Sequence, residues 1–328
     1  MAGAIMNLRR RQFLCLAAAA AALVPRTTWA QAYPTRPVRL IVGFVAGSTS
    51  DILARLIGPW LSERLGQQFI IENRPGAGAN IATEAVVKAP ADGYTLLMVA
   101  PTAAINATLY EKLNYNFLRD MAPVAGVVRV PNVLEVNPSV PAKTVPELID
   151  LARASPGSLA FASAGVGTAS HLAGEMFKTK TGVDLVHVAY RGDGQAMTDL
   201  IGGQVQVGFA TMTASIGHIR SGKLRPLAVT TTTRSDVLPE LPTVADFVPG
   251  YEASSWFGVA APKDTPAEAI DMLNREINAG LADPRIKARL ADMSGMPLKG
   301  SPADFRQLIA DETEKWGRVI RTANIKAE

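Results

Sequence analysis

The sequence predicts an α/β fold in which the strands of mostly parallel sheets alternate with helices. Short apolar runs, such as residues 38–44 and 94–100, alternate with segments whose apolar residues recur at helical spacing. In the clearest helical segment, residues 52–65, apolar side chains stand at positions 53, 56, 57, 60, 61 and 65. Repeated strand, loop and helix units are typical of sheets with helices on both faces.

The elements follow in order along the chain. We expect strands at residues 38–44, 69–72, 94–100, 133–136, 158–163, 186–188, 207–209 and 227–230. We expect helices near residues 52–65, 145–154, 169–181, 193–202 and 213–221, with mainly two more helices after about residue 263. Thr144, Thr265 and Ser301 each stand three residues before an acid, which is the pattern of a capping box. Pro266 and Pro302 should occupy first helical positions.

The first 30 residues resemble an export leader. Arg9, Arg10 and Arg11 precede an apolar run at residues 13–24, which is too short to span a bilayer. A cleavage site of small residues ends at Ala30, so the exported chain would begin at Gln31 and reach the periplasm. The paired arginines also fit a twin-arginine signal, and the ordinary and the twin-arginine export routes both stay open.

Removing the leader changes the charge and cysteine arguments. Four of the 33 basic residues lie in the leader, which has no acid, so the remaining chain carries 29 charges of each sign. This neutrality gives no support for nucleic-acid binding. The single cysteine, Cys15, is also in the leader, which leaves no disulfide and no thiolate. About 298 residues remain, enough for two packed cores, and no later apolar run is long enough to span a membrane.

Residues 44–51 form the first turn that could bind a ligand. The turn joins the carboxyl end of a strand to the start of a helix, where ligands bind in open α/β sheets. Free amides at a helix start favour an anion, Gly47 permits close approach, and Ser48, Thr49 and Ser50 add hydroxyl donors. The alternative is that Thr49 or Ser50 only caps the helix.

Residues 163–171 form a second glycine-bearing turn between a strand and a helix. The segment around Gly165 and Gly167 approaches a dinucleotide fingerprint, with Asp184 about 20 residues onward. However, Ser170 stands where that motif has its third glycine or an alanine, and the turn lies in mid-chain. The same amides would serve a carboxylate equally well, and both interpretations remain open.

The sequence does not match the other catalytic motifs that were considered. No nucleophile elbow or Walker sequence is present, and no histidine has a second ligand at metal spacing, so we expect no metal site and no cofactor. His171 could contact a ligand or act as a buried hydrogen-bonding group, and His187 fits a structural role. Arg191 could pair with a carboxylate or stay solvated beside Asp193. Trp256 and Phe257 could wall a pocket or fill a core.

Several short motifs resemble one known family. They are Tyr33-Pro-Thr-Arg-Pro-Val-Arg-Leu-Ile-Val, Glu72-Asn-Arg-Pro-Gly-Ala-Gly, Asp92-Gly-Tyr-Thr-Leu-Leu, Ser163-Ala-Gly-Val-Gly-Thr with His171-Leu, His187-Val-Ala-Tyr-Arg-Gly, Pro242-Thr-Val and Trp256-Phe-Gly. In this order, the motifs resemble the receptors of tripartite tricarboxylate transporters, the Bug-type, TctC-like extracytoplasmic solute receptors. The resemblance runs from Tyr33 almost to Ile325.

The resemblance implies a two-lobed, periplasmic-binding-protein fold of type II-like topology. Each lobe would be a doubly wound mixed sheet flanked by helices, with the ligand cleft between the lobes. Lobe 1 would be discontinuous, comprising residues 33–131 and 252–328, and lobe 2 would comprise residues 132–251. A chain that leaves lobe 1 and returns would cross the cleft twice.

The resemblance also implies a function without a reaction. The protein would be a monomeric solute-binding protein that captures a small mono- or dicarboxylate, possibly aromatic, for the membrane subunits of a tripartite transporter. The alternatives are a ligand-sensing receptor in a two-component signalling system and, further off, a nicotinamide-dependent enzyme. The identity of the carboxylate and the open or closed state are not predicted.

The strand-to-helix turns of the family map onto a set of predicted ligand-binding residues, which are Phe44, Ala46, Gly47, Ser48, Thr49, Asp51, Thr102, Ala103, Ser163, Ala164, Gly165, Gly167, Thr168, His171, Tyr190, Arg191, Ala210 and Thr211. Two positions depart from the family pattern. Ser48 replaces a usual glycine and adds a hydroxyl. Ala210 replaces a common aspartate, and losing that acceptor would argue against a ligand with an amino group.

Overall fold

The computed structural model describes residues 33–327. The chain divides into two units, residues 1–35 and 36–328, and the features below all lie in the second unit. The predicted leader and its cleavage site lie outside the described residues. In the described part of the chain, no helix is both long enough and apolar enough to cross a membrane.

Three parallel strands open the first half of a large sheet. They are β1 (Val38–Val42), β2 (Phe69–Asn73) and β3 (Thr95–Val99), with β1 between the other two. The helical elements that connect and follow them are α2 (Thr49–Leu65), η1 (Ala77–Ala79), α3 (Asn80–Val87), α4 (Thr102–Leu109) and α5 (Phe117–Asp120). The buried strand residues are almost all aliphatic, because both faces of a parallel sheet are covered.

The second half repeats this plan. Its strands are β5 (Ala160–Ser163), β6 (Val186–Ala189), β7 (Val207–Thr211) and β8 (Arg225–Val229). Its helical elements are α6 (Val145–Ala154), α7 (Ala169–Thr181), α8 (Asp193–Ile201), α9 (Met212–Arg220) and η2 (Val244–Asp246). The parallel order β7-β5-β6 places the turns after these strands at one edge of the sheet.

Two long strands connect the halves. β4 (Met121–Val136) pairs antiparallel with β9 (Ser254–Pro262) as far as Pro131, and from Asn132 onward it pairs with β7 and β8. The resulting sheet has the order β2-β1-β3-β9-β4-β7-β5-β6. This mixed, twice-crossed arrangement is the predicted two-lobed fold. The sequence predicted only the last four residues of β4 and none of β9.

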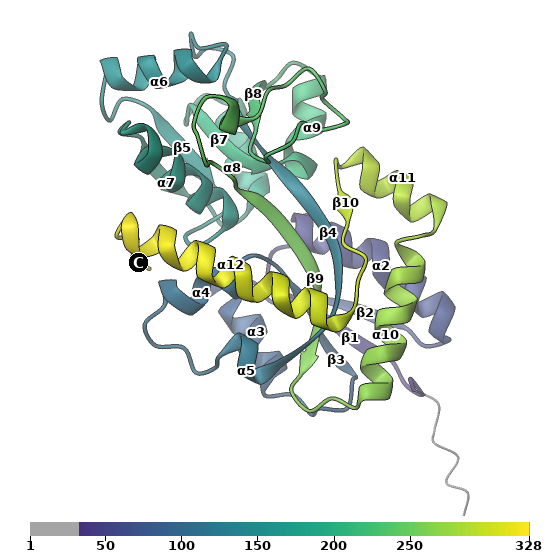
Figure 1. Ribbon diagram of the computed structural model, residues 1–328. Helices are drawn as coiled ribbons and strands as arrows, with labels where there is room; N and C mark the ends of the chain where they lie inside the picture. Colours follow the sequence, from purple (N-terminus) through teal and green to yellow (C-terminus); the bar gives the residue numbers. More distant parts are fainter. Residues whose placement is uncertain (1–32, 328) are drawn as a thin grey trace, which may run out of the picture. The chain divides into compact units, whose positions relative to one another are not determined.

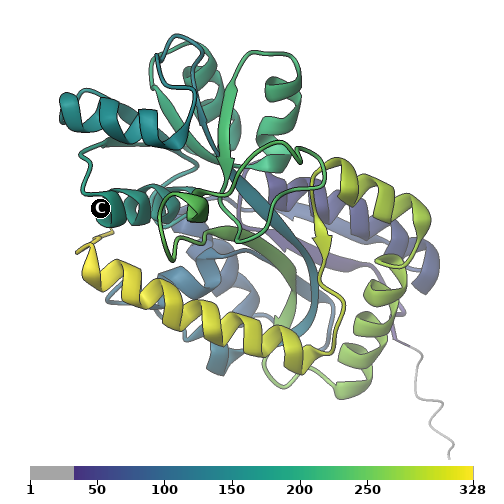
Figure 2. The ribbon, with the colours of Figure 1, turned by 45° about the horizontal axis from the view of Figure 1, so that its top comes forward.

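The C-terminal segment returns to the first half, as the family resemblance implied. It forms α10 (Ala267–Gly280), α11 (Pro284–Asp292), β10 (Met296–Pro297) and α12 (Pro302–Thr322), one helix more than predicted. In Figures 1 and 2, α12 runs along the crossing strands beside α4, and it packs against α4, β4 and α7.

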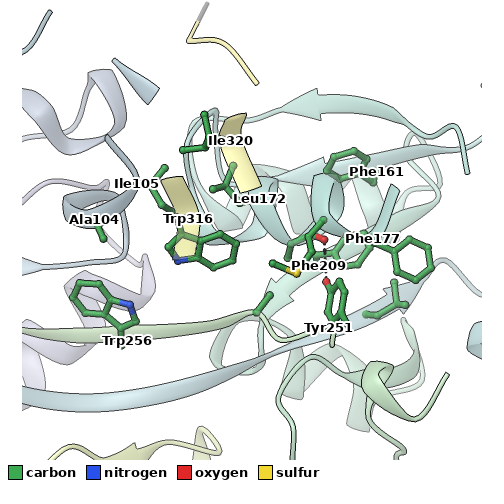
Figure 3. Close-up of a cluster of buried hydrophobic side chains, with 14 of the residues drawn as sticks. Ala104, Ile105, Phe161, Leu172, Phe177, Phe209, Tyr251, Trp256, Trp316 and Ile320 are labelled. Carbon is green, nitrogen blue, oxygen red and sulfur yellow. Dashed lines mark hydrogen bonds between the residues drawn. The ribbon is translucent and has the colours of Figure 1, made fainter. Parts of the chain in front are cut away.

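The largest buried apolar cluster extends across both halves. Figure 3 shows Ile105 of α4, Leu172 of α7 and Trp316 of α12 together, close to Ile320, and the same cluster continues to Phe209. A second buried cluster, around Met197 and Leu200, lies within the second half alone. Burial of the apolar side chains in the largest cluster stabilises the observed packing of the two halves by roughly 25 cal/mol per Å² of apolar area.

The predicted helix starts have mixed outcomes. Thr144 and Ser301 accept from the amides of Glu147 and Asp304, and the Ser301 box is complete. The Thr265 box is wrong, because the Thr265 hydroxyl donates to the carbonyl of Pro262 and α10 begins later. Pro266 is accordingly the N-cap of α10 and does not occupy its first turn.

Candidate functional site

A cavity lies where the carboxyl ends of the parallel strands of both halves meet β9. It encloses about 50 Å³ of free space, and a water molecule needs roughly 10–15 Å³ of such space. The cavity can therefore hold a small polar group of a ligand. Its lining residues are Phe44, Ser48, Thr49, Ser50, Ala100, Pro101, Thr102, Ala164, Thr168, Ala169, Ser170, Gly192, Asp193, Thr211, Ser255 and Phe257.

The start of α2 forms one wall of the cavity. Ser48 is the N-cap, and its hydroxyl accepts from the amide of Asp51 at 3.4 Å. The amides of Thr49 and Ser50 occupy the first two helical positions, where no carbonyl lies one turn earlier to accept from them. Within the described chain neither amide donates a hydrogen bond, so both are available to a ligand.

The Asp51 side chain holds the turn before α2 in place. The Asp51 carboxylate accepts from the amide of Gly47 at 2.9 Å, from Asn73 at 2.9 Å and from Arg55 at 2.9 Å. Burial alone would raise the pKa of Asp51, but the hydrogen bonds from Arg55, Gly47 and Asn73 lower it below its usual value. Asp51 is thus a charged anchor of the turn, and the Gly47 amide is already engaged.

The start of α7 forms the opposite wall with the same geometry. Thr168 is the N-cap, and its hydroxyl accepts from the amide of His171 at 3.4 Å. The amides of Ala169 and Ser170 occupy the first two positions and have no acceptor among the described residues. The Ser170 hydroxyl accepts from the amide of Ala164 at 3.0 Å, which fixes the turn before the helix.

A stack of three rings supports this second turn. His171 lies over His187 with ring centroids 4.0 Å apart, and His187 lies over Phe161 at 4.8 Å. His171 Nδ1 accepts from the amide of Gly167 at 3.2 Å, and His187 Nε2 is 2.7 Å from the Ser163 hydroxyl. Burial lowers the pKa of His171 to about 3 and that of His187 to about 4, so both rings are neutral.

Direct contacts close the cavity between the halves. The hydroxyl oxygens of Thr49 and Thr211 are 2.9 Å apart, and both side chains are buried. Gly167 lies against α4, since a Cβ atom at that position would stand 2.5 Å from Leu109 Cδ2. The structure therefore shows the site in a closed arrangement.

Backbone amides supply the positive electrostatic character of the cavity, and Asp193 is the one acidic residue among the described residues that line it. No lysine, arginine or histidine is among the described residues that line it. Helix starts carry about half a positive charge, and α2 and α7 direct theirs toward one space from opposite sides. Such a space suits a carboxylate, which accepts from several amides at once.

Comparison with known proteins identifies the family. Residues 53–325 match the family model described as the tripartite tricarboxylate transporter family receptor. The chain belongs to this family. Among curated proteins, it is 39% identical to Protein BugT of Bordetella pertussis over 300 residues, which cover 90% of this chain and 92% of BugT. It is therefore a Bug-type, TctC-like solute receptor.

Solved structures of this family share its fold. The R. palustris protein Rpa4515 with adipate is 41% identical, has a TM-score of 0.87, and is matched over 90% of this chain and 99% of its own. The periplasmic binding protein BugD is 32% identical with a TM-score of 0.85, matched over 90% of this chain and 100% of its own. MatC from Rhodopseudomonas palustris with bound malate is 29% identical with a TM-score of 0.83, matched over 88% and 100%.

The receptor brings some of the predicted site residues to the cavity. Seven of them line it, namely Phe44, Ser48, Thr49, Thr102, Ala164, Thr168 and Thr211. Trp256, offered as a pocket wall, is fully buried in the core, whereas its neighbour Phe257 lines the cavity.

The other predicted residues lie behind or beside the cavity. The remaining members of the set, which do not line it, are Ala46, Gly47, Asp51, Ala103, Ser163, Gly165, Gly167, His171, Tyr190, Arg191 and Ala210. The glycines shape the turns, and their amides donate to Asp51, Ser163 and His171. The Tyr190 hydroxyl donates to Asp199, and Arg191 is exposed.

The predicted ligand-binding set left out another group of cavity residues, although one of them, Phe257, was offered as a pocket wall. They are Ser50, Ala100, Pro101, Ala169, Ser170, Gly192, Asp193, Ser255 and Phe257. The signal for Ser50, Ala169 and Ser170 was present, because first-turn residues directly after an N-cap carry the free amides of a helix. Ser255 had no signal, since the strand β9 that carries it was not predicted.

Metal-ligating side chains do not gather in the described part of the receptor. Among these residues, no group of three histidine, cysteine, aspartate or glutamate side chains is placed to hold a metal ion.

Proposed function

We propose that this receptor captures a small carboxylate in the cavity between its halves and delivers it to the membrane subunits of a tripartite transporter. The observation that carries the proposal is the pair of capped helix starts, α2 and α7, whose free amides face one space. In each helix the N-cap hydroxyl accepts from the amide of the third helical residue, and the amides of the first two residues remain free for a ligand. A carboxylate offers two oxygens, so it can accept from both helices.

Binding would proceed by closure of two lobes. We assign residues 33–131 and 252–328 to lobe 1 and residues 132–251 to lobe 2, because β4 changes partners between Pro131 and Asn132. The ligand favours the closed state only through the additional contacts that it makes there. Closure joins the amides of α2 to those of α7 and excludes water from the carboxylate.

The relatives support the ligand class and the location. The related structures with adipate and malate contain small carboxylates, and BugD is a periplasmic binding protein. An export leader at residues 1–30, cleaved near Ala30, would bring this receptor to the same compartment. Delivery of an unchanged ligand requires no catalytic group, so we propose no reaction, metal or cofactor.

A thermal-shift screen tests the proposal. A bound carboxylate at a hundredfold excess over its Kd should stabilise the receptor by about 2.7 kcal/mol, which is readily seen as a rise in Tm. The matched control for each acid is its uncharged primary amide, which should give no shift. Equal shifts from acids and amides, or no shift from a broad panel of both, would show that the cavity is not a carboxylate site.

A pull-down tests the delivery step. The ligand-bound receptor should recover transporter membrane subunits from membranes of its own host, and the ligand-free receptor should recover fewer. Recovery of a membrane sensor kinase in their place would contradict the transport assignment and favour signalling.

A further inference from the structure

The cavity contains one feature that a simple anion site does not explain. Asp193 is the only charged residue among the described residues that line it. It stands at the first position of α8, directly after Gly192. A negative charge at Asp193 repels a second negative charge on the ligand, which costs binding free energy. A ligand avoids this cost when the group that it places next to Asp193 is neutral or positive.

Asp193 has no partner within the protein. Among the described residues, no side chain or amide donates a hydrogen bond to its carboxylate, and no cation pairs with it. Two other buried acids of the receptor differ in this respect. Asp51 accepts from three donors, and Glu135 of β4 accepts from the Ser215 hydroxyl at 2.6 Å.

Asp193 is half-buried, so part of its surface is open to water. Burial raises the pKa of Asp193 to about 6, so at neutral pH most molecules carry the charge. Burial raises the pKa of Glu135 to about 8, and the Asp193 charge adds to that shift. Glu135 is therefore mainly neutral at neutral pH and adds little negative charge of its own.

We propose that Asp193 selects carboxylates whose far end donates a hydrogen bond, through a hydroxyl or ammonium group, over carboxylates that end in a second carboxylate. The ligand carboxylate would lie at the free amides of α2 and α7, and its donor group would face Asp193. This inference rests on the proposed function, because it presupposes a carboxylate in the cavity.

The proposal revises one expectation from the sequence. Ala210 replaces an acceptor that is common in the family, and its loss argued against amino-bearing ligands. Asp193 supplies an acceptor to the cavity lining from the start of α8, whereas Ala210 lies on β7 outside that lining. Exclusion of amino groups therefore does not follow from Ala210.

The test compares ligands of equal chain length by calorimetry at pH 7.5. The three-carbon set is malonate, 3-hydroxypropanoate, 3-aminopropanoate and propanoate, and the four-carbon set is succinate, 4-hydroxybutanoate, 4-aminobutanoate and butanoate. In the set that fits, the donor-bearing acid should bind about tenfold or more tightly than the dicarboxylate. Asp193→Asn should reduce or reverse this ratio. Asp150→Asn, which changes an exposed acid of α6, should preserve it.

The pH dependence of the native receptor gives a second readout that needs no variant. As the pH falls from 7.5 to 6, protonation of Asp193 should weaken binding of the ammonium acid relative to the plain monocarboxylate of equal length. Dicarboxylates are left out of this readout, because their own second carboxyl groups also take up protons as the pH falls. Glu135 stays mainly neutral over this range, because its pKa is about 8, and His171 and His187 stay neutral, because their pKa values are about 3 and 4.

The outcomes separate the two proposals. Dicarboxylates that bind as tightly as donor-bearing acids at pH 7.5, with a ratio unchanged in Asp193→Asn, would overturn the role of Asp193 and leave carboxylate capture intact. No binding of any acid in either set, together with a negative thermal screen, would overturn the proposed function and this inference with it.

Discussion

Gly167→Ala tests whether the closed arrangement is the one that holds the ligand. Gly167 has φ of +76°, and an added Cβ would stand 2.5 Å from Leu109 Cδ2 of α4, on the opposite half. The added methyl group should therefore act as a wedge, because it pushes the two halves apart at Gly167 and Leu109. It should also strain the backbone, because alanine at positive φ costs about 1–2 kcal/mol.

A matched control separates these two effects. Gly182 follows α7 with φ of +70°, and a Cβ atom added there would meet no atom within 4 Å, so Gly182→Ala brings the backbone strain without the wedge. Both variants should lose about 1–2 kcal/mol of unfolding free energy in urea. The wedge adds roughly 1–3 kcal/mol against the closed state alone, which corresponds to about 5- to 150-fold weaker ligand binding.

Calorimetry with a carboxylate from the thermal screen measures the difference. Gly167→Ala should bind at least about fivefold more weakly than Gly182→Ala. Adding Leu109→Val to Gly167→Ala removes the clashing atom and should recover most of the affinity. If the two glycine variants bind within twofold of each other, closure between Gly167 and Leu109 is not part of ligand capture.

Two further predictions concern buried titratable groups. Because burial raises the pKa of Glu135 to about 8, the folded state holds a proton that the unfolded chain releases, and stability should fall as the pH rises from about 4.5 through 8. Glu135→Gln should therefore stabilise the receptor by about 2–4 kcal/mol at pH 9 and have little effect at pH 4.5, and an equal shift at both pH values in denaturant melts would contradict this. The histidine pair has the opposite sign, since its pKa values are lowered to about 3 and 4. Stability should be complete above pH 6.5 and decline toward pH 4; His187→Phe, which preserves the ring stack, should flatten that decline, and an unchanged slope would refute the assignment.

Elements with local signals were predictable from the sequence. Helices α6 and α7 begin and end at the predicted residues, because Thr144 and Thr168 cap their starts and Gly182 ends α7 in the left-handed conformation. These signals act within one helical turn and do not depend on the rest of the fold.

The crossing strands were not predictable in the same way. β4 contains Pro123 and Pro131, which locally argue against a strand. The pairing with β9 accommodates the first of them through a shift in register between Pro123 and Ala125. Pairing of strands about 120 residues apart depends on tertiary contacts that no local pattern contains.

The site was predictable to the level of its turns, and not to the level of its atoms. The sequence located both glycine-bearing turns, but it could not show that the amides of Gly47 and Gly167 are already bonded to Asp51 and His171. Similarly, the sequence reasoning considered Asp193 only as the neighbour of Arg191. Only the tertiary structure places this residue in the cavity lining.

A crystal structure of the receptor with a carboxylate from the thermal screen tests the central claim most directly. We predict that the carboxylate oxygens lie about 2.7–3.2 Å from the amide nitrogens of Thr49 or Ser50 on one side and of Ala169 or Ser170 on the other. A carboxylate bound to the exposed Arg191, with these four amides facing only water, would contradict the account.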